Sequence, residues 1–242
     1  MRPVPSVHQP APIVSDERAS TAPVYLVPFA GLFGAVLMIS LVLAGKIVSV
    51  GGLTFTAAVI VFPASYLFGD VLTEVYGYSS TRAVVWTGFL AQALWILAYG
   101  IAAALPPAPF WPHQAAFEAV LGATPRLALA GLAAYLTGEF LNAYLLAKLK
   151  LRFRGRGLPA RLVASTLVGQ GIDSALFIGL GFGGLYPAAD LVRLALSIWA
   201  LKVAWEIVAL PLSVPLIGFL KRAEGRDAFD TDTDFNPFRL RG

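Results

Sequence analysis

Polar residues recur at helical spacing inside apolar segments of this 242-residue chain. Glu139 and Asn142 are three residues apart, and so are Gln170 and Asp173. Residues at this spacing share one face of a helix. Carboxylates at mid-depth in lipid are costly and are usually functional. The spacing therefore predicts polar helix faces that meet in the interior of a membrane protein and bind a ligand.

Two further pairs lie four residues apart, Asp70 with Glu74 and Lys202 with Glu206. Trp199 precedes Lys202 by one turn and is a candidate to stack on a flat ligand. Acidic side chains outnumber cations within these segments, so some acids must be neutralised by protonation, by a ligand or by a helix terminus.

Simpler structural roles remain open for these two pairs. Lys202 and Glu206 could form an ion pair that only holds their helix in place. Asp70 and Glu74 could cap a cytoplasmic turn together with Arg82. The mid-depth acids of the other two pairs are harder to explain in this way.

Composition places the chain in a membrane. Hydrophobic residues make up 57% of it, charged residues 13%, and the mean hydropathy is +0.73, whereas soluble domains carry roughly 25% charged residues. There is no cysteine, and the two histidines, His8 and His113, fall outside the apolar segments. We therefore expect no catalytic residue, metal or cofactor in the spans. The net charge of +4 comes from short Lys/Arg-rich segments, which indicates membrane topology and no direct nucleic-acid binding.

The predicted fold is an all-α polytopic membrane protein with six transmembrane helices and a central polar cavity. A basic loop from Lys148 to Arg161 belongs on the cytoplasmic side, which makes both termini cytoplasmic. Pro63 is expected to kink the second helix. Residues 1–22 read as a disordered tail, 23–220 as the membrane domain and 221–242 as a cytoplasmic tail. The spans are expected at about 23–44, 53–76, 83–104, 125–146, 162–185 and 191–220.

Five sequence blocks occur in an order typical of one family. They are Lys46 followed by GGLTFTAAVIVFP, then DVLTEVYG with Arg82 after it, then GEFLNA, RLVASTLVGQGIDSALF and KVAWEIVALP. With these blocks the chain resembles the six-helix queuosine precursor transporters of the vitamin uptake transporter group. It departs from the usual pattern at Thr73, where many relatives have Asn, and at Ser80-Thr81, where Ala-Arg is usual.

The resemblance implies a multi-pass protein of the bacterial plasma membrane that is not an enzyme. It implies import of 7-cyano-7-deazaguanine, 7-aminomethyl-7-deazaguanine or queuine for salvage into tRNA queuosine, without an ATPase module. Whether the protein works as a monomer or a homodimer is left open.

Base chemistry suggests how such a substrate is held. A deazaguanine presents adjacent N–H donors that one carboxylate can accept in a bidentate contact, and Glu139 or Asp173 is expected to do so. Hydrogen-bond donors and stacking rings are expected among Asn142, Gln170, Lys202, Trp199 and Phe177. The surplus acids raise the hypothesis of proton coupling through Asp70–Glu74 or Glu206, with Arg82 holding an inner gate.

Three other interpretations compete with this one. The cargo could be another small vitamin or purine-like solute. An intramembrane enzyme is disfavoured because the spans carry no histidine, and Ser165 has no base beyond Asp173. A structural scaffold would not need so many buried acids.

Overall fold

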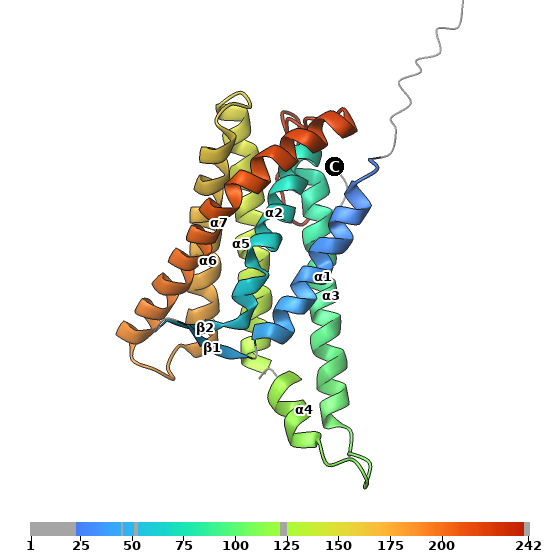
Figure 1. The fold of residues 1–242 in the computed structure, drawn as a ribbon, viewed down its shortest axis with the longest axis vertical. Helices are drawn as coiled ribbons and strands as arrows, with labels where there is room; N and C mark the ends of the chain where they lie inside the picture. The colour runs from blue at the N-terminus through green and yellow to red at the C-terminus, as the bar shows by residue number, and fades with distance from the viewer. Residues whose placement is uncertain (1–22, 45, 51–52, 122–124, 240–242) are drawn as a thin grey trace, which may run out of the picture.

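The computed structural model describes residues 23–44, 46–50, 53–121 and 125–239, and it is a bundle of long helices (Figure 1). Among the described residues, five helices are long enough and apolar enough to cross a bilayer. They are α1 (Leu26–Ala44), α3 (Tyr78–Ala104), α5 (Pro125–Arg152), α6 (Leu158–Phe182) and α7 (Ala188–Glu224). The predicted all-α membrane fold is confirmed at this level.

The sixth passage through the bundle is made of several short pieces. An antiparallel hairpin of β1 (Ile47–Val50) and β2 (Leu53–Thr56) is followed by a 3₁₀ turn (Ala57–Ile60), α2 (Phe62–Val71) and a π-helical turn (Leu72–Tyr76). Figure 1 shows this path running from the hairpin at one end of the bundle to the opposite end. The predicted start of a helix at Leu53 is wrong. Threonines alternate with Leu53 and Phe55 in β2, after a Gly-Gly pair in the sequence that favours a hairpin.

Pro63 begins a helix instead of kinking one. It lies in the first two positions of α2, where backbone N–H groups have no intrahelical acceptor, so proline removes no hydrogen bond. The predicted kink at Pro63 is therefore wrong. In contrast, α7 is 37 residues long and contains Pro211 and Pro215 in its interior.

The two ends of the described chain lie at the same end of the bundle (Figure 1). The start of α1, the turn between α5 and α6, and the C-terminal segment all lie at one end (Figure 1). A short helix, α4 (Gln114–Leu121), lies in the Pro-rich connection between α3 and α5.

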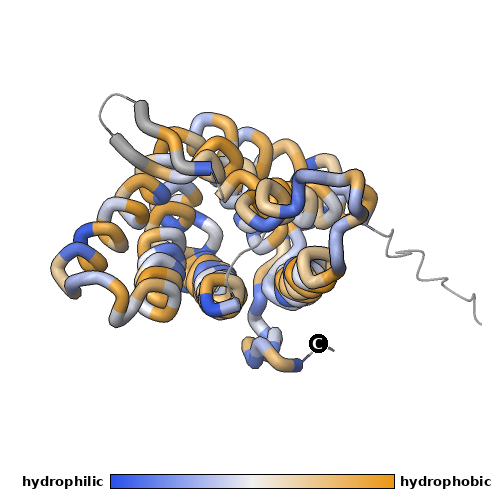
Figure 2. Tube along the Cα trace, turned by 90° about the horizontal axis from the view of Figure 1, so that it is seen from below, coloured by the Kyte–Doolittle hydropathy of each residue, from blue (hydrophilic) through white to orange (hydrophobic). Residues whose placement is uncertain are grey.

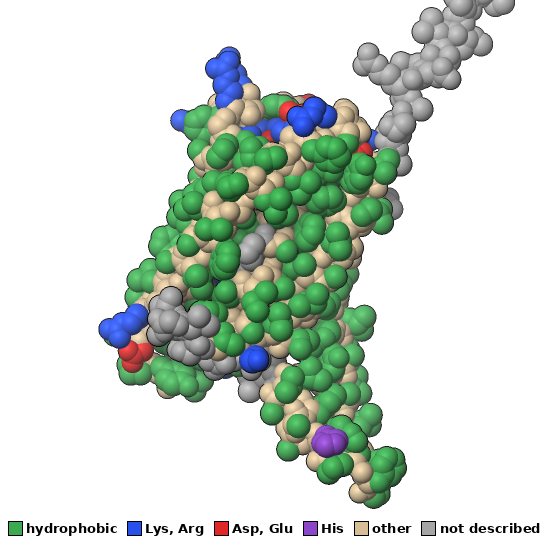
Figure 3. Space-filling view, in the orientation of Figure 1, with side chains coloured by type: hydrophobic (Ala, Val, Ile, Leu, Met, Phe, Trp, Pro, Cys, Tyr) green, Lys and Arg blue, Asp and Glu red, His purple; other side chains and the backbone are tan. Residues whose placement is uncertain are grey.

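The surface of the bundle is apolar along its length. Leu94 and Leu129 are each 67% exposed, which would be costly in water and is favourable in lipid. Viewed along the bundle, hydrophobic residues occupy much of the helix surfaces (Figure 2). On the face drawn in Figure 3, hydrophobic side chains form a wide band, and charged side chains gather toward the ends.

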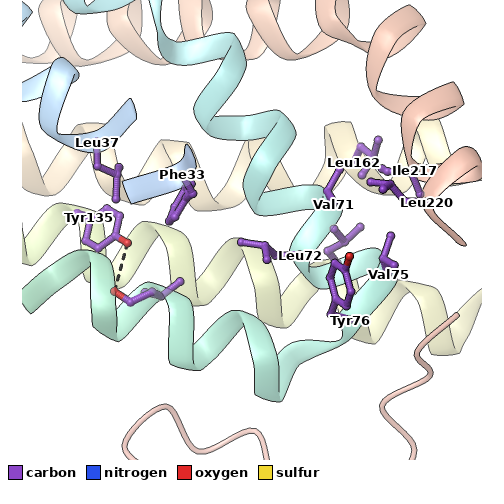
Figure 4. Packing of buried hydrophobic residues seen from close by; sticks show 12 residues of the cluster. Phe33, Leu37, Val71, Leu72, Val75, Tyr76, Tyr135, Leu162, Ile217 and Leu220 are labelled. Carbon is purple, nitrogen blue, oxygen red and sulfur yellow. Dashed lines mark hydrogen bonds between the residues drawn. The ribbon is translucent and has the colours of Figure 1, made fainter. Parts of the chain in front are cut away.

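Buried apolar residues fix α2 at the centre. Figure 4 shows Phe33 and Leu37 of α1 near Tyr135 of α5, whose hydroxyl donates to the Val85 carbonyl at 3.2 Å. The same cluster continues along α2 and its π-helical turn to the ends of α6 and α7. This packing holds α2 between the helices that carry the predicted polar faces.

Two glycines bring α5 and α6 into close contact. A Cβ atom at Gly138 would lie 2.7 Å from the Asp173 Cβ, and one at Gly169 would lie 2.8 Å from the Asn142 Cβ. Both distances are shorter than real Cβ contacts allow, so only glycine fits at this crossing. Small residues of this kind let membrane helices approach closely.

Candidate functional site

Lys202 of α7 reaches across to α6 in the middle of the bundle. Its ammonium donates to Gln170 Oε1 at 2.9 Å and to the Asp173 carboxylate. The Lys202 side chain is 10% exposed and that of Asp173 18%, so this ion pair is largely shielded from solvent. It joins two helices, whereas the sequence also allowed a pair within α7 alone.

The amide of Gln170 is oriented by this contact. An ammonium group only donates hydrogen bonds, so Gln170 must present its carbonyl oxygen to Lys202. Its NH₂ group then points elsewhere and can donate to a ligand.

Glu139 of α5 lies beside the Lys202–Asp173 ion pair. Its carboxyl is within electrostatic reach of Asp173 and Lys202, and its Oε2 is 3.4 Å from the position of a Cβ at Gly69 of α2. Tyr66 of α2 is buried and within electrostatic reach of both acids. The structure thus brings the predicted faces of α5, α6 and α7 together. Across the described ranges, no group of three His, Cys, Asp or Glu side chains is placed to hold a metal ion.

Asp70 and Glu206 form a second, deeper feature. Both are completely buried; the carboxyl of Asp70 meets that of Glu206, with Asn142 beside it. When both groups are counted as carboxylates, the Asn142 amide beside Asp70 is a neutral donor near their four oxygens, but none of these oxygens has a hydrogen bond of normal geometry among the described residues. Carboxylates only accept hydrogen bonds, so the two groups can bond to each other only when one carries a proton.

Glu74 lies apart from this pair, at the end of the bundle. Arg161 of α6 donates to both of its carboxylate oxygens, at 2.7 and 3.0 Å. Lys221 of α7 donates to the same carboxylate at 2.6 Å, and Lys150 of α5 lies 3.4 Å from it and donates to the Glu74 carbonyl at 2.7 Å. One buried carboxylate therefore ties four segments together, with a bidentate arginine as its strongest partner.

The π-helical turn separates the two acids that the sequence placed on one face. Asp70 ends up against α7, and Glu74 faces the basic residues at the bundle end. π-helical turns often occur at functional sites.

Arg82 has other partners than the carboxylate pair with which it was expected to interact. Its guanidinium donates at 2.8 Å to the backbone carbonyls of Asp234 and Asn236. In the sequence, Lys150 and Arg161 indicate only the orientation of the chain in the membrane, and nothing in their spacing links them to Glu74.

The aromatic candidates differ in how available they are. Trp199 donates its indole N–H to a backbone carbonyl of α6 at 2.9 Å, and its Nε1 lies 3.3 Å from the position of a Cβ at Gly171. Phe177 contacts a neighbouring phenylalanine ring at 6.0 Å. Tyr66 is more central and was missed, although its position one turn before Asp70 was a usable signal.

Comparison with known proteins identifies the family. Residues 56–216 match the family model described as "Putative vitamin uptake transporter". The chain belongs to the vitamin uptake transporter family. This assignment makes it a multi-pass membrane transporter and not an enzyme.

One relative of this transporter is a Bacillus subtilis (strain 168) protein named "Probable queuosine precursor transporter". The two are 32% identical over 169 residues, which is 69% of this chain and 73% of that protein. No solved structure matches this transporter significantly.

Proposed function

We propose that this transporter imports a queuosine precursor, namely 7-cyano-7-deazaguanine, 7-aminomethyl-7-deazaguanine or queuine, across a bacterial plasma membrane. The observation that carries the proposal is the Glu139 carboxyl, held in the membrane interior beside the Lys202–Asp173 ion pair. The name of the Bacillus subtilis relative supports the same cargo.

The geometry favours Glu139 over Asp173 as the acceptor of the substrate's N–H edge. Asp173 is already bonded to Lys202, so Glu139 is the better placed acceptor for a ligand. The Gln170 NH₂ group is free to turn toward the substrate carbonyl, and Asn142 can read a ring nitrogen. The proposed binding site lies between these side chains, and an aromatic ring would form one wall of it.

Tyr66 is the ring wall we favour, because it is buried among the acids of the site. Trp199 and Phe177 stay as alternatives at the edges of the same faces. The protein acts without an ATPase module. The start of α1 and the C-terminal segment face the cytoplasm, because the basic turn between α5 and α6 lies at the same end of the bundle (Figure 1).

Gating and coupling are assigned to the other two acidic features. The Glu74 cluster consists of Glu74 with Lys150, Arg161 and Lys221. It is the inner gate, since it joins the ends of α5, α6 and α7 to the π-helical turn that follows α2. The Asp70–Glu206 pair carries the coupling proton. Arg82 supports the gate through the C-terminal segment.

Uptake of radiolabelled precursor tests the proposal. Glu139→Gln should lower uptake about tenfold to a hundredfold, because a hydrogen bond to a charged group contributes about 1.5–3 kcal/mol. Glu118→Gln is the matched control, since Glu118 lies on α4, at the end of the bundle opposite the turn between α5 and α6 (Figure 1). Equal uptake by wild type, Glu139→Gln and Asp173→Asn would contradict the assignment.

A purine-like solute other than a queuosine precursor is the second candidate, because a carboxyl beside an amide donor suits any ring with adjacent N–H groups and a carbonyl. Growth rescue of a strain that cannot make queuosine separates the two. Rescue of growth by low concentrations of precursor supports the first cargo. Inhibition of uptake by other purines and not by queuosine precursors supports the second.

A further inference from the structure

The C-terminal segment, residues 226–239, packs across the end of the bundle. The chain leaves α7 at Gly225, whose φ of 59° turns it back. The N–H of Ala228 donates to the Val75 carbonyl at 3.3 Å. The carboxylate of Asp230 accepts the N–H of Tyr78 at 3.1 Å, which satisfies the first turn of α3.

The same segment satisfies a cation buried in α3. The Arg82 residue is 2% exposed, and its guanidinium donates to two backbone carbonyls of the segment at 2.8 Å. Trp86, one turn further along α3, donates its indole N–H to the Pro237 carbonyl at 2.7 Å. A guanidinium at this position without acceptors would be strongly destabilising, so α3 and the segment depend on each other.

Asp227 connects the segment to the Glu74 cluster. Its carboxylate accepts hydrogen bonds from Lys150 at 2.5 Å and from Lys221 at 2.8 Å. Burial alone would raise the pKa of Asp227, but these lysines outweigh it and hold the pKa below its ordinary value. The carboxylate is therefore charged at neutral pH.

The charge balance of the cluster depends on Asp227. Arg161, Lys150 and Lys221 bring three positive charges, and Glu74 and Asp227 bring two negative ones, so the net charge is +1. Without Asp227 the same cluster carries +2. Repulsion between its cations would then favour separation of the helix ends.

The attachment at the Asp227 end of the segment is also easy to reverse, whereas the Arg82 end holds it to α3. Residues 226–239 contain no helix or strand, and the Asp227 side chain is 47% exposed. A hollow of about 230 Å³ lies between Val75, Tyr76 and residues 226–228. Ion pairs with exposed partners stabilise a fold little, and segments held in this way open locally.

We propose that residues 226–239 form a latch on the inner gate, which must detach from the Glu74 cluster for solute to leave toward the cytoplasm. Asp227 is the residue that links the latch to the gate, and Arg82 is the anchor on α3. This inference rests on the transport function proposed above but not on the identity of the solute.

A reversible cross-link tests whether the latch must move. The chain has no cysteine, so Val75→Cys with Ala228→Cys introduces the only two thiols. After oxidation, uptake should fall about tenfold or more and should recover on reduction. The two single variants, oxidised in the same way, should keep their uptake. Full cross-linking, verified by mass spectrometry, with unchanged uptake would overturn the latch.

A second measurement needs no solute. Ser165 is completely buried on α6, one turn from Arg161, and Ser165→Cys can report opening through its alkylation by a charged maleimide in inside-out vesicles. Adding Asp227→Asn should accelerate alkylation about tenfold. Adding Asp232→Asn, on an exposed residue of the same segment, should not.

The two measurements separate the possible failures. Equal alkylation rates with Asp227→Asn and Asp232→Asn would contradict the latch whatever the cargo is. Faster alkylation with Asp227→Asn in a protein that takes up no queuosine precursor would support the latch and reject the proposed cargo.

Discussion

At Asp70 and Glu206, two completely buried carboxyls meet without a cation between them. Glu139 of α5 is within electrostatic reach of Asp70, and Lys202, one turn before Glu206 on α7, is bonded to α6. Two adjacent carboxyls cannot both ionise readily. A single shared proton fits this arrangement and gives the pair its proposed role in coupling.

Asp70→Asn should uncouple transport from the proton gradient, because the amide keeps the shape and the hydrogen bond but does not titrate. In vesicles, an imposed gradient that is acidic outside should accelerate uptake by the wild type and not by Asp70→Asn. Exchange of solute without a gradient should persist in both. Asp190→Asn, an exposed residue, is the control. Wild-type uptake that ignores the gradient would make the protein a facilitator.

At the scale of elements, the α5–α6 crossing decides where the site residues lie. The glycines at this crossing let Asn142 of α5 pack directly on Gly169 of α6, and Asp173 of α6 on Gly138 of α5. Gly169→Ala should therefore lower the free energy of unfolding by about 1–3 kcal/mol, the usual cost of overpacking. Thermal melting in detergent measures it. Gly179→Ala on the same helix has nothing within 4 Å of the new Cβ, and it should melt like the wild type or slightly higher. Equal melting of both variants would show that the crossing tolerates a methyl group.

The elements themselves were only partly predictable. Long apolar runs predicted α3, α5, α6 and α7 because a helix is the only way such a run satisfies its backbone in lipid. The run after Leu53 is short, and an apolar run of that length is compatible with strand and helix alike. The hairpin and the π-helical turn therefore depend on tertiary packing and not on the local sequence alone.

For the whole molecule, charge distribution predicts the orientation in the membrane. Arg126 is a cation at the opposite end of the bundle, where its guanidinium donates to the Leu180 carbonyl at 2.7 Å near the end of α6.

In the cysteine-free chain, Ala108→Cys in the exposed Pro-rich connection should react with an impermeant maleimide in intact cells. Asp232→Cys should react only after permeabilisation. The reverse pattern would invert the proposed orientation.

The sequence by itself determined that the chain lies in lipid, where its long apolar helices run and which helix faces carry polar residues. These follow from hydropathy and helical spacing, which are local properties of the chain. It also predicted that Glu139, Asp173 and Lys202 belong together, because lipid excludes charges from the outer faces.

Only the tertiary structure decided which groups pair. Glu74 is bound by residues that are 76, 87 and 147 positions away, and Arg82 by carbonyls more than 150 positions away. Spacing along one helix carries no information about such partners, since they depend on how helices and the C-terminal segment pack. The latch and the separation of Asp70 from Glu74 are therefore properties of the packed bundle.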